Sequence, residues 1–295
     1  MDVLILILII FGATIMLGNI FAYLYFLYRL RDVLSSGSKK DAILSNIGFA
    51  LLVFFLAGYI FVAFTSNKDI LVALLLFFGS IFVSLVIVVM SHLLSTAKTR
   101  SLEIADALIG IIDARDPNLH GHSRHVKNLT MLFYSYLPHH YKSALNPISL
   151  EFASLMHDVG KLEVPEGILN KPAKLNDEEW AIMKMHPKYG VKLLKPIKSF
   201  DAISDWILYH HERIDGNGYY KQEPSAIPLA SKIISIADTY SAITMRRSYK
   251  DARSHEEAIK IIKEVAGTQL DKDLVEIFVN IPKEKILACI PANIE

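Results

Sequence analysis

Three long stretches without charged side chains dominate the first third of this chain. Residues 3–28 and 47–65 contain no Asp, Glu, Lys, Arg or His, and residues 70–94 contain only His92. At about 1.5 Å of rise per residue, even the shortest stretch would cover about 28 Å as a helix, close to the hydrocarbon thickness of a bilayer. The sequence therefore predicts a transmembrane region over residues 1–93, with a lipid bilayer as its partner.

The basic residues around these stretches predict an orientation. The loop between the first two stretches carries four of them, Arg29, Arg31, Lys39 and Lys40, and two more follow the third stretch, Lys98 and Arg100. The loop before the third stretch carries only Lys68 and Asp69. Because basic loops are retained on the cytoplasmic side, we expect an external amino terminus and a cytoplasmic location for everything after residue 95.

The composition excludes some classes of partner and of covalent structure. Hydrophobic residues make up 52% of the chain, and this excess lies in the three stretches. A net charge of +1 provides no basic excess for a nucleic-acid polymer. The single cysteine, Cys289, cannot form an internal disulfide, and we expect it to pack as a small apolar residue.

The rest of the chain has the pattern of helices, so the predicted fold class is all-α. Residues 94–115 have apolar side chains at mostly three- and four-residue steps, which predicts a connecting helix. This helix either signals and forms a homodimer, or its second half is the core-facing first helix of the next domain. Asn176 and Glu179 predict a capped helix start, and the polar residues 212–227 predict one long loop.

Histidines and acidic residues are concentrated after the transmembrane region. Ten of the 11 histidines follow residue 95, and His157 stands next to Asp158. Imidazole and carboxylate groups without cysteine suit Fe, Mn or Zn rather than a structural zinc finger. The carboxylate of Asp158 could bridge two ions. The neighbours His210 and His211 could reach one ion only from a distorted or terminating helix turn, because adjacent residues do not share a helix face.

The order of the motifs over residues 105–281 resembles a known family, the HD-GYP group of HD-domain metal-dependent phosphohydrolases. The motifs are RDPNLHGHSRHV, HDVGK, ILNKPAKLNDEEW, HPKYG, HHERIDGNGYY, IADTYSAIT, RRSYK and AGTQLD. This resemblance implies an all-helical HD-type catalytic domain over residues 105–295.

The resemblance also implies roles for individual residues. One metal site would comprise His122, His157, Asp158 and Asp238, and the other His186, His210 and His211, with Asp158 as the bridge. Lys161 would contact the substrate phosphate, so Asp158 and Lys161 are the catalytic candidates. Arg247, Lys250 and Tyr219 are further substrate-binding candidates, and Asp215, Gly216 and Gly218 belong with Tyr219 to the signature loop.

The activity implied by this family is hydrolysis of cyclic di-GMP, a bacterial second messenger, to pGpG and GMP. Two divalent ions, Fe or Mn, would activate a hydroxide that attacks phosphorus, and the fixed charge of Lys161 would stabilise the phosphate oxygens. The expected protein is a multi-pass signal-transduction hydrolase of the bacterial inner membrane, with its catalytic domain in the cytoplasm.

Several positions depart from the family pattern. Tyr220 replaces the proline of the signature loop, Ser241 replaces a frequent aspartate, and Ser248 replaces another proline. Asn118 stands near the place of a glutamate ligand in three-metal relatives, which favours two ions here. The remaining histidines of this region are expected to be solvated or capping residues: His120, His125, His139, His140 and His255.

Two other functions fit the same motifs. The altered loop could serve a catalytically weak scaffold that binds a partner such as a diguanylate cyclase. Alternatively, the enzyme could act on another cyclic dinucleotide or a phosphorylated nucleotide, because the motifs contain no base contacts.

Overall fold

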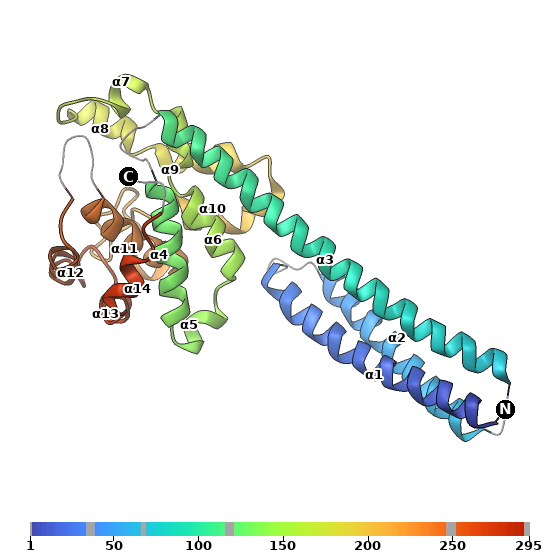
Figure 1. The fold of residues 1–295 in the computed structure, drawn as a ribbon. Helices are drawn as coiled ribbons and strands as arrows, with labels where there is room; N and C mark the ends of the chain where they lie inside the picture. The colour runs from blue at the N-terminus through green and yellow to red at the C-terminus, as the bar shows by residue number, and fades with distance from the viewer. Residues whose placement is uncertain (1, 34–38, 66–68, 116–120, 246–251, 292–295) are drawn as a thin grey trace. The chain divides into compact units, whose positions relative to one another are not determined.

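The computed structural model describes residues 2–33, 39–65, 69–115, 121–245 and 252–291 (Figure 1). The chain divides into two compact units, Met1–Ser101 and Leu102–Glu295. Over the described ranges every regular element is a helix, and Ala266 and Leu270 form an isolated bridge. The predicted all-α class is confirmed.

The first unit contains the apolar helices that the sequence predicted. They are α1 (Asp2–Val33), α2 (Lys39–Phe64) and the first part of α3 (Ile70–Arg115). Their segments long and apolar enough to cross a membrane are Val3–Tyr28, Ile43–Phe64 and Ile70–Ala97. Most of their large apolar side chains are exposed, as expected for helices that face lipid rather than water.

The helices of the first unit are also joined by polar contacts. The Asn19 side-chain Nδ2 of α1 donates to the Ser80 backbone carbonyl of α3 at 3.0 Å, and the Ser84 hydroxyl donates to the Asn19 side-chain Oδ1 at 2.7 Å. Asn19 and Ser80 are buried. Because a polar group in hydrocarbon needs an internal partner, these bonds favour one pairing of α1 with α3.

The predicted connecting segment 94–115 is the carboxyl-terminal part of α3. Ala105 and Ile109 are buried in the core of the second unit, with 3% and 0% exposure. The Arg124 guanidinium donates to the Asp106 carboxylate at 2.8 Å and 3.2 Å. The second half of this segment is therefore the core-facing first helix of the domain, and the dimer remains a prediction.

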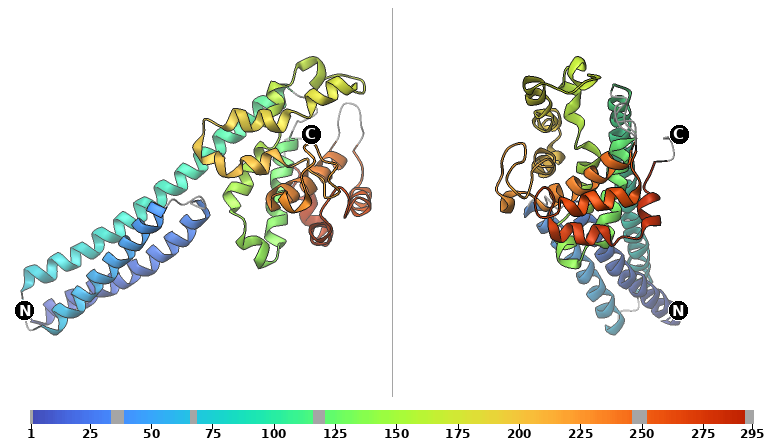
Figure 2. Two further views of the ribbon diagram at one scale, coloured as in Figure 1. Left: turned by 180° about the vertical axis from the view of Figure 1, so that it is seen from behind. Right: turned by 90° about the vertical axis from the view of Figure 1, so that its left-hand side faces the viewer.

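The second unit is a set of short helices around α4, which packs against α6 and α11 (Figure 2). The aromatic rings of Phe133, Tyr240 and Phe278 pack in its buried core. The elements are α4 (His122–Tyr136), α5 (His139–Ser143), α6 (Pro147–Met156), η2 (Val159–Glu163), α7 (Glu166–Leu169), α8 (Asp177–Met183), α9 (His186–Leu194), η3 (Lys198–Ile203), α10 (Ser204–Leu208), η4 (Pro224–Ala226), α11 (Leu229–Thr244), α12 (His255–Glu264), α13 (Lys272–Val279) and α14 (Lys283–Leu287).

Local signals in the sequence account for several helix ends. The predicted cap of α8 is present: the Asn176 side chain accepts from the Glu179 backbone N–H, and the Glu179 carboxylate accepts from that of Asn176. Pro187 lies in the first turn of α9, where its missing N–H costs nothing. The predicted loop over residues 212–227 includes the short helix η4.

Candidate metal centre

His157 and Asp158 lie at a break between two helices. α6 ends at Met156, and η2 begins at Val159. A β-carbon on Gly160 would lie 1.8 Å from the His186 carbonyl oxygen and 2.3 Å from the Gly190 nitrogen, so only glycine allows η2 to approach α9 this closely. This approach brings the Asp158 carboxylate to within 3.1 Å of His186 Nε2.

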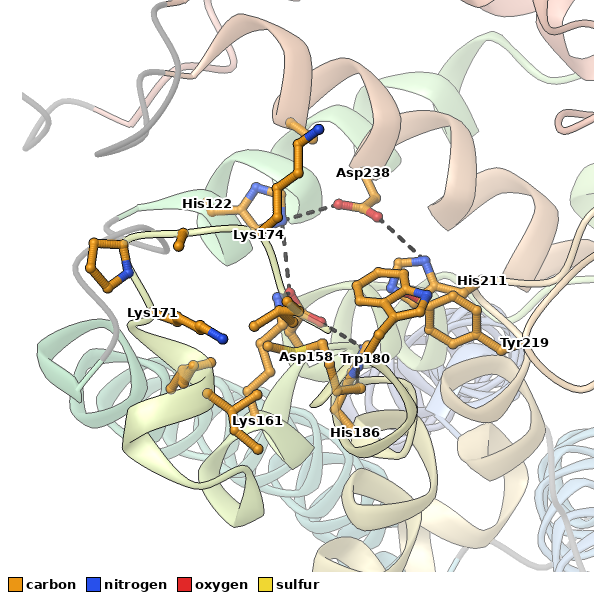
Figure 3. Close-up of a pocket in the computed structure, with 17 residues that line it drawn as sticks. His122, Asp158, Lys161, Lys171, Lys174, Trp180, His186, His211, Tyr219 and Asp238 are labelled. Atoms are coloured by element: carbon orange, nitrogen blue, oxygen red, sulfur yellow. Dashed lines mark hydrogen bonds and ion pairs between the residues drawn. The ribbon is translucent and has the colours of Figure 1, made fainter. Parts of the chain in front are cut away.

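The other candidate ligands converge on Asp158 from four elements. His122 begins α4, and its Nε2 is 3.9 Å from Asp158 Oδ2 and 3.1 Å from Asp238 Oδ1. His210 and His211 follow the end of α10, the terminating turn that their adjacency requires, and their ring centroids are 4.0 Å apart. Figure 3 shows His122, Asp158, His186, His211 and Asp238 around one cavity.

Backbone contacts define the tautomer of three of these histidines. Their Nδ1 atoms contact the carbonyl oxygen three residues earlier, at 2.8 Å for His157, 2.9 Å for His186 and 2.6 Å for His210. A carbonyl can only accept, so each Nδ1 carries the proton. In the neutral ring each Nε2 therefore keeps a lone pair, and those of His186 and His210 lie 3.5 Å apart. Metal-ligating histidines have this arrangement.

The ligand atoms form two groups that share Asp158. One group is His122, His157 and Asp158, and the other is Asp158, His186, His210 and His211; within each group they lie within 4.8 Å of one another. His157 Nε2 and Asp158 Oδ1 are buried without a hydrogen-bond partner, which a bound cation would supply. The clustered residues fit divalent metal ions. Asp238 lies beside both groups, since its Oδ2 is 4.0 Å from His211 Nδ1.

The electrostatics of the site favour anionic carboxylates at Asp158 and Asp238 and neutral imidazoles at His210 and His211. Burial alone would raise the pKa of Asp158, but the Lys161 ammonium lowers it well below its usual range. The pKa of Asp238 is likewise lowered by His122 against the effect of burial. Burial and neighbouring imidazoles lower the pKa of His210 and bring that of His211 to about 3. His157 differs, because the Asp158 carboxylate raises its pKa although burial lowers it.

The centre opens into a cavity of about 640 Å³, a size typical of small-molecule sites. Lys161 lines it and donates to Asp158 Oδ2 at 2.6 Å, one turn of η2 away. Tyr219 also lines it, and its ring packs on His211 with centroids 4.6 Å apart. Burial, together with the nearby carboxylates of Asp158 and Asp238, raises the pKa of the Tyr219 hydroxyl, so this group stays neutral.

Ser241 connects a candidate ligand to a second buried histidine. Its Oγ lies 2.9 Å from His122 Nδ1 and 3.0 Å from His125 Nδ1. His125 is 1% exposed, so the prediction of a solvated or capping residue was wrong. α4 packs against α11, and the i, i+3 spacing of the two histidines turns both rings toward Ser241. Burial lowers the pKa of His125 to about 4, so it is neutral at pH 7.

His255 also differs from its prediction. It is the first residue of α12 but does not cap it, since Ser254 is the N-cap residue. Its ring is partly buried, and its Nδ1 lies 2.8 Å from the Tyr240 hydroxyl. His139 and His140 are exposed as predicted.

Glu212 organises the signature loop. Its buried carboxylate accepts from the backbone N–H groups of Tyr220 at 2.6 Å and Gln222 at 2.8 Å. Proline could not donate the first of these bonds. The Tyr220 hydroxyl also donates to the Lys184 carbonyl at 3.2 Å, and the ammonium of Lys188 lies 4.7 Å from the Tyr220 ring centroid. Tyr220 therefore joins the loop to the α8–α9 region in place of the family proline.

Some predicted residues lie outside the described ranges. They are the substrate-binding candidates Arg247 and Lys250, together with Ser248, Asn118 and His120. Four other residues at or near the site were not predicted from the sequence. Glu212 belongs to the motif HHERIDGNGYY, and Lys171, Lys174 and Trp180 belong to the motif ILNKPAKLNDEEW. Their positions within these two motifs were the only sequence signal of a role at the site.

The region that contains this centre is similar to known proteins. Residues 106–274 match the family described as the HD domain. A cyclic di-GMP phosphodiesterase of Vibrio cholerae is 36% identical over 203 residues, which are 64% of this chain and 41% of the relative. A 3'3'-cGAMP-specific phosphodiesterase 2 of the same organism is 33% identical, covering 63% of this chain and 36% of the relative.

A third relative comes from another organism. A cyclic di-GMP phosphodiesterase of Thermotoga maritima is 33% identical over 187 residues, with 62% of this chain and 50% of the relative covered. The chain thus spans half the length or less of these three curated relatives.

Proposed function

Because the chain belongs to the HD-domain family, we propose that it is a metal-dependent phosphodiesterase that hydrolyses cyclic di-GMP to pGpG and GMP. One observation carries this proposal: two groups of ligand atoms, all buried except the partly exposed His211, share Asp158 at the base of an open cavity. The names of the relatives from Vibrio cholerae and Thermotoga maritima support the substrate.

Different residues of the chain would have different roles in this hydrolysis. His122, His157, Asp158 and Asp238 would hold one ion, and His186, His210 and His211 the other, with Asp158 shared. When bound, the ions would supply an activated water and polarise a phosphoryl oxygen. Lys161 is positioned by Asp158 at the cavity wall, where its ammonium can offset negative charge that develops on the phosphate.

We propose two ions, either Fe or Mn. The ligand atoms are imidazole nitrogens and carboxylate oxygens, and the only cysteine, Cys289, is buried in the core instead. This nitrogen and oxygen set is compatible with both metals. Metal analysis of the purified protein would give the number and identity of the ions.

The activity is tested by incubating the purified chain with Mn²⁺ or Fe²⁺ and cyclic di-GMP, and separating the products. We expect pGpG and GMP, and loss of both products in His157→Ala and Asp158→Ala. His139→Ala, at an exposed position that does not line the cavity, is the matched control. Absence of pGpG and GMP with both metals would contradict the proposed phosphodiesterase activity. Full cellular function in the two inactive variants would instead favour a scaffold that binds a diguanylate cyclase.

A second candidate substrate is 3'3'-cGAMP. It is favoured by a relative of that specificity that is 33% identical to this chain. Equal amounts of the two cyclic dinucleotides in one reaction would rank them by their ratio of kcat/KM. Faster consumption of 3'3'-cGAMP would make it, rather than cyclic di-GMP, the proposed substrate.

We also propose that the first unit holds the enzyme in the bacterial inner membrane with the catalytic unit in the cytoplasm, and that the connecting helix supports a homodimer. The basic loops support this orientation. An Asn67→Cys variant should react with a membrane-impermeant maleimide in intact cells, whereas Glu284→Cys should react only after lysis. The reverse pattern would overturn the orientation, and crosslinking in membranes would test the dimer.

A further inference from the structure

The cavity extends beyond the metal centre, and its far wall has a different chemistry. This wall is formed by the segment from Ile168 to Leu175 and by Trp180 and Met183 of α8. Apart from two lysines it is apolar. A phosphate bound at the metal centre would need only the first part of the cavity, so the wall is available for the rest of a larger ligand.

Trp180 is the largest side chain of this wall, and it is 43% exposed. Its ring meets that of Tyr219 edge to face, with centroids 6.1 Å apart and planes at 83°. Tyr219 in turn packs on the candidate ligand His211. Figure 3 shows Trp180 beside Tyr219 and His211 at the cavity. An aromatic row thus leads from the metal centre to an accessible indole surface.

The position of Trp180 is set before any ligand binds. It is in the first turn of α8, and its backbone N–H donates to the Asn176 backbone carbonyl at 2.8 Å. The capping box of Asn176 and Glu179 holds this turn, and the Lys171 ammonium holds both oxygens of Glu179, at 2.6 Å and 2.7 Å. A helix turn that is already ordered loses little further entropy on binding, which favours affinity.

The two lysines of the wall differ in their partners. Lys171 is occupied by Glu179, whereas Lys174 is exposed and lines the cavity. No carboxylate pairs with Lys174 in the part of the chain that the structure describes. The wall therefore combines one aromatic face with one available cation, which matches a nucleobase next to a phosphate.

We propose that Trp180 is a stacking platform for a nucleobase of the bound cyclic dinucleotide, with Lys174 facing the phosphate that is not at the metal centre. This inference rests on the proposed function, because it assumes that a cyclic dinucleotide is the substrate. Stacking on an indole is tolerant of base identity. Trp180 therefore contributes affinity for cyclic di-GMP and 3'3'-cGAMP alike and does not discriminate between them.

Steady-state kinetics of the full chain test the platform. We expect Trp180→Ala to raise KM for cyclic di-GMP at least about fivefold with kcat within about twofold, since stacking is made equally in the ground and transition states. Trp180→Phe should recover most of this loss. Tyr136→Ala, which removes an aromatic ring that is 41% exposed and does not line the cavity, should leave KM unchanged.

Charge at Lys174 is tested in the same assay. Lys174→Gln should raise KM, and the increase should shrink at high salt because screening weakens the wild-type contact. Lys260→Gln removes an exposed lysine of α12 outside this cavity and is the matched control. An unchanged KM in Lys174→Gln would remove the phosphate contact from the proposal.

Intrinsic fluorescence gives a direct reading of stacking. The chain has two tryptophans, and the other one, Trp206, is partly buried against the core. In the Trp206→Phe variant, mixing the metal-loaded protein with cyclic di-GMP should quench Trp180 before products form.

The outcomes separate this inference from the proposed function. Unchanged fluorescence, or an unchanged KM in Trp180→Ala, would overturn the platform while wild-type hydrolysis left the function standing. Quenching of the Trp180 fluorescence by cyclic di-GMP without any hydrolysis would support the stacking platform and contradict the proposed enzyme activity. If Trp180→Ala failed to fold, the fluorescence experiment would decide.

Discussion

At the residue scale, Ser241 is the contact that orients a candidate ligand. Ligation through His122 Nε2 requires the proton on Nδ1, and the Ser241 oxygen 2.9 Å away is placed to accept it. The hydroxyl proton can then go to Met245 Sδ at 3.3 Å or to His125. A side chain at the position of a frequent family aspartate thus acts as a neutral partner of two histidines.

Ser241→Ala should weaken metal binding at the His122 group by about 10- to 100-fold, because removing an outer partner of a ligating histidine has effects of this size. Titration against a competing chelator measures it, and Ser241→Thr, which keeps the hydroxyl, should be closer to the wild type. Ser235→Ala on the same helix is the control. Wild-type affinity for both metal equivalents in Ser241→Ala would contradict this role.

Tyr220 makes a contact that proline would remove. Tyr220→Pro loses the N–H that donates to Glu212, which we expect to cost about 1–3 kcal/mol of unfolding free energy at a buried carboxylate. The gain from a stiffer unfolded chain is smaller, about 0.4–1 kcal/mol. Denaturant unfolding in detergent measures the balance, and Tyr220→Phe, which keeps the N–H, should lose less. A more stable Tyr220→Pro would refute the argument.

Cys289 should be unreactive in the folded protein. Burial raises the pKa of its thiol to about 11, and the residue is 8% exposed. The thiolate form exists only as the pH approaches that value, so reaction with a disulfide reagent at pH 8 should be far slower than in denaturant and should accelerate as the pH rises. Glu284→Cys provides an exposed thiol as the control. Equal rates in native and denatured protein would show that Cys289 is exposed.

At the scale of elements, two helices begin with the same device in different places. α8 begins with the capping box of Asn176 and Glu179, and α12 with that of Ser254 and Glu257. Of these two helices only α8 lines the cavity, through Trp180 and Met183, so the two caps have the same role in folding and different roles at the site.

Asn176→Ala and Ser254→Ala should each lower the unfolding free energy by about 1 kcal/mol, the usual effect of losing a cap. Asn176→Ala should in addition raise KM for the dinucleotide, because the first turn of α8 would no longer hold Trp180. Unfolding curves and steady-state kinetics on both variants make the comparison. The same change in KM for both would show that the effect is general destabilisation.

At the scale of the whole molecule, the two units require different surroundings. The first exposes apolar side chains along three helices, and the second buries most of its apolar side chains in one core. We expect the chain to sediment with membranes and to resist release by high salt and alkaline carbonate, because salt weakens charge contacts but not burial in hydrocarbon. Detergent should release it. Release by salt alone would mean surface attachment.

The sequence by itself indicated three helices long and apolar enough to cross a membrane, the α8 cap and the identity of the candidate ligands. The helices and the cap depend on composition or on spacing within a few residues, where local geometry is predictable, whereas the candidate ligands were implied by the resemblance of the motifs to the HD-GYP family. The motifs HDVGK and HHE also indicated the family before any contact was known. The fold brings the predicted metal ligands together, whereas the substrate-binding candidates Arg247 and Lys250 lie outside the described ranges.

Only the tertiary structure decided that His125 is buried, that Ser241 lies between two histidines, that Glu212 holds the Tyr220 loop and that Trp180 lines the cavity. Ser241 and His122 are 119 residues apart, and their contact exists because α4 packs against α11. The wrong prediction for His125 has the same origin. Periodicity shows that a helix has a buried face, but which side chain it meets depends on the helix packed against it.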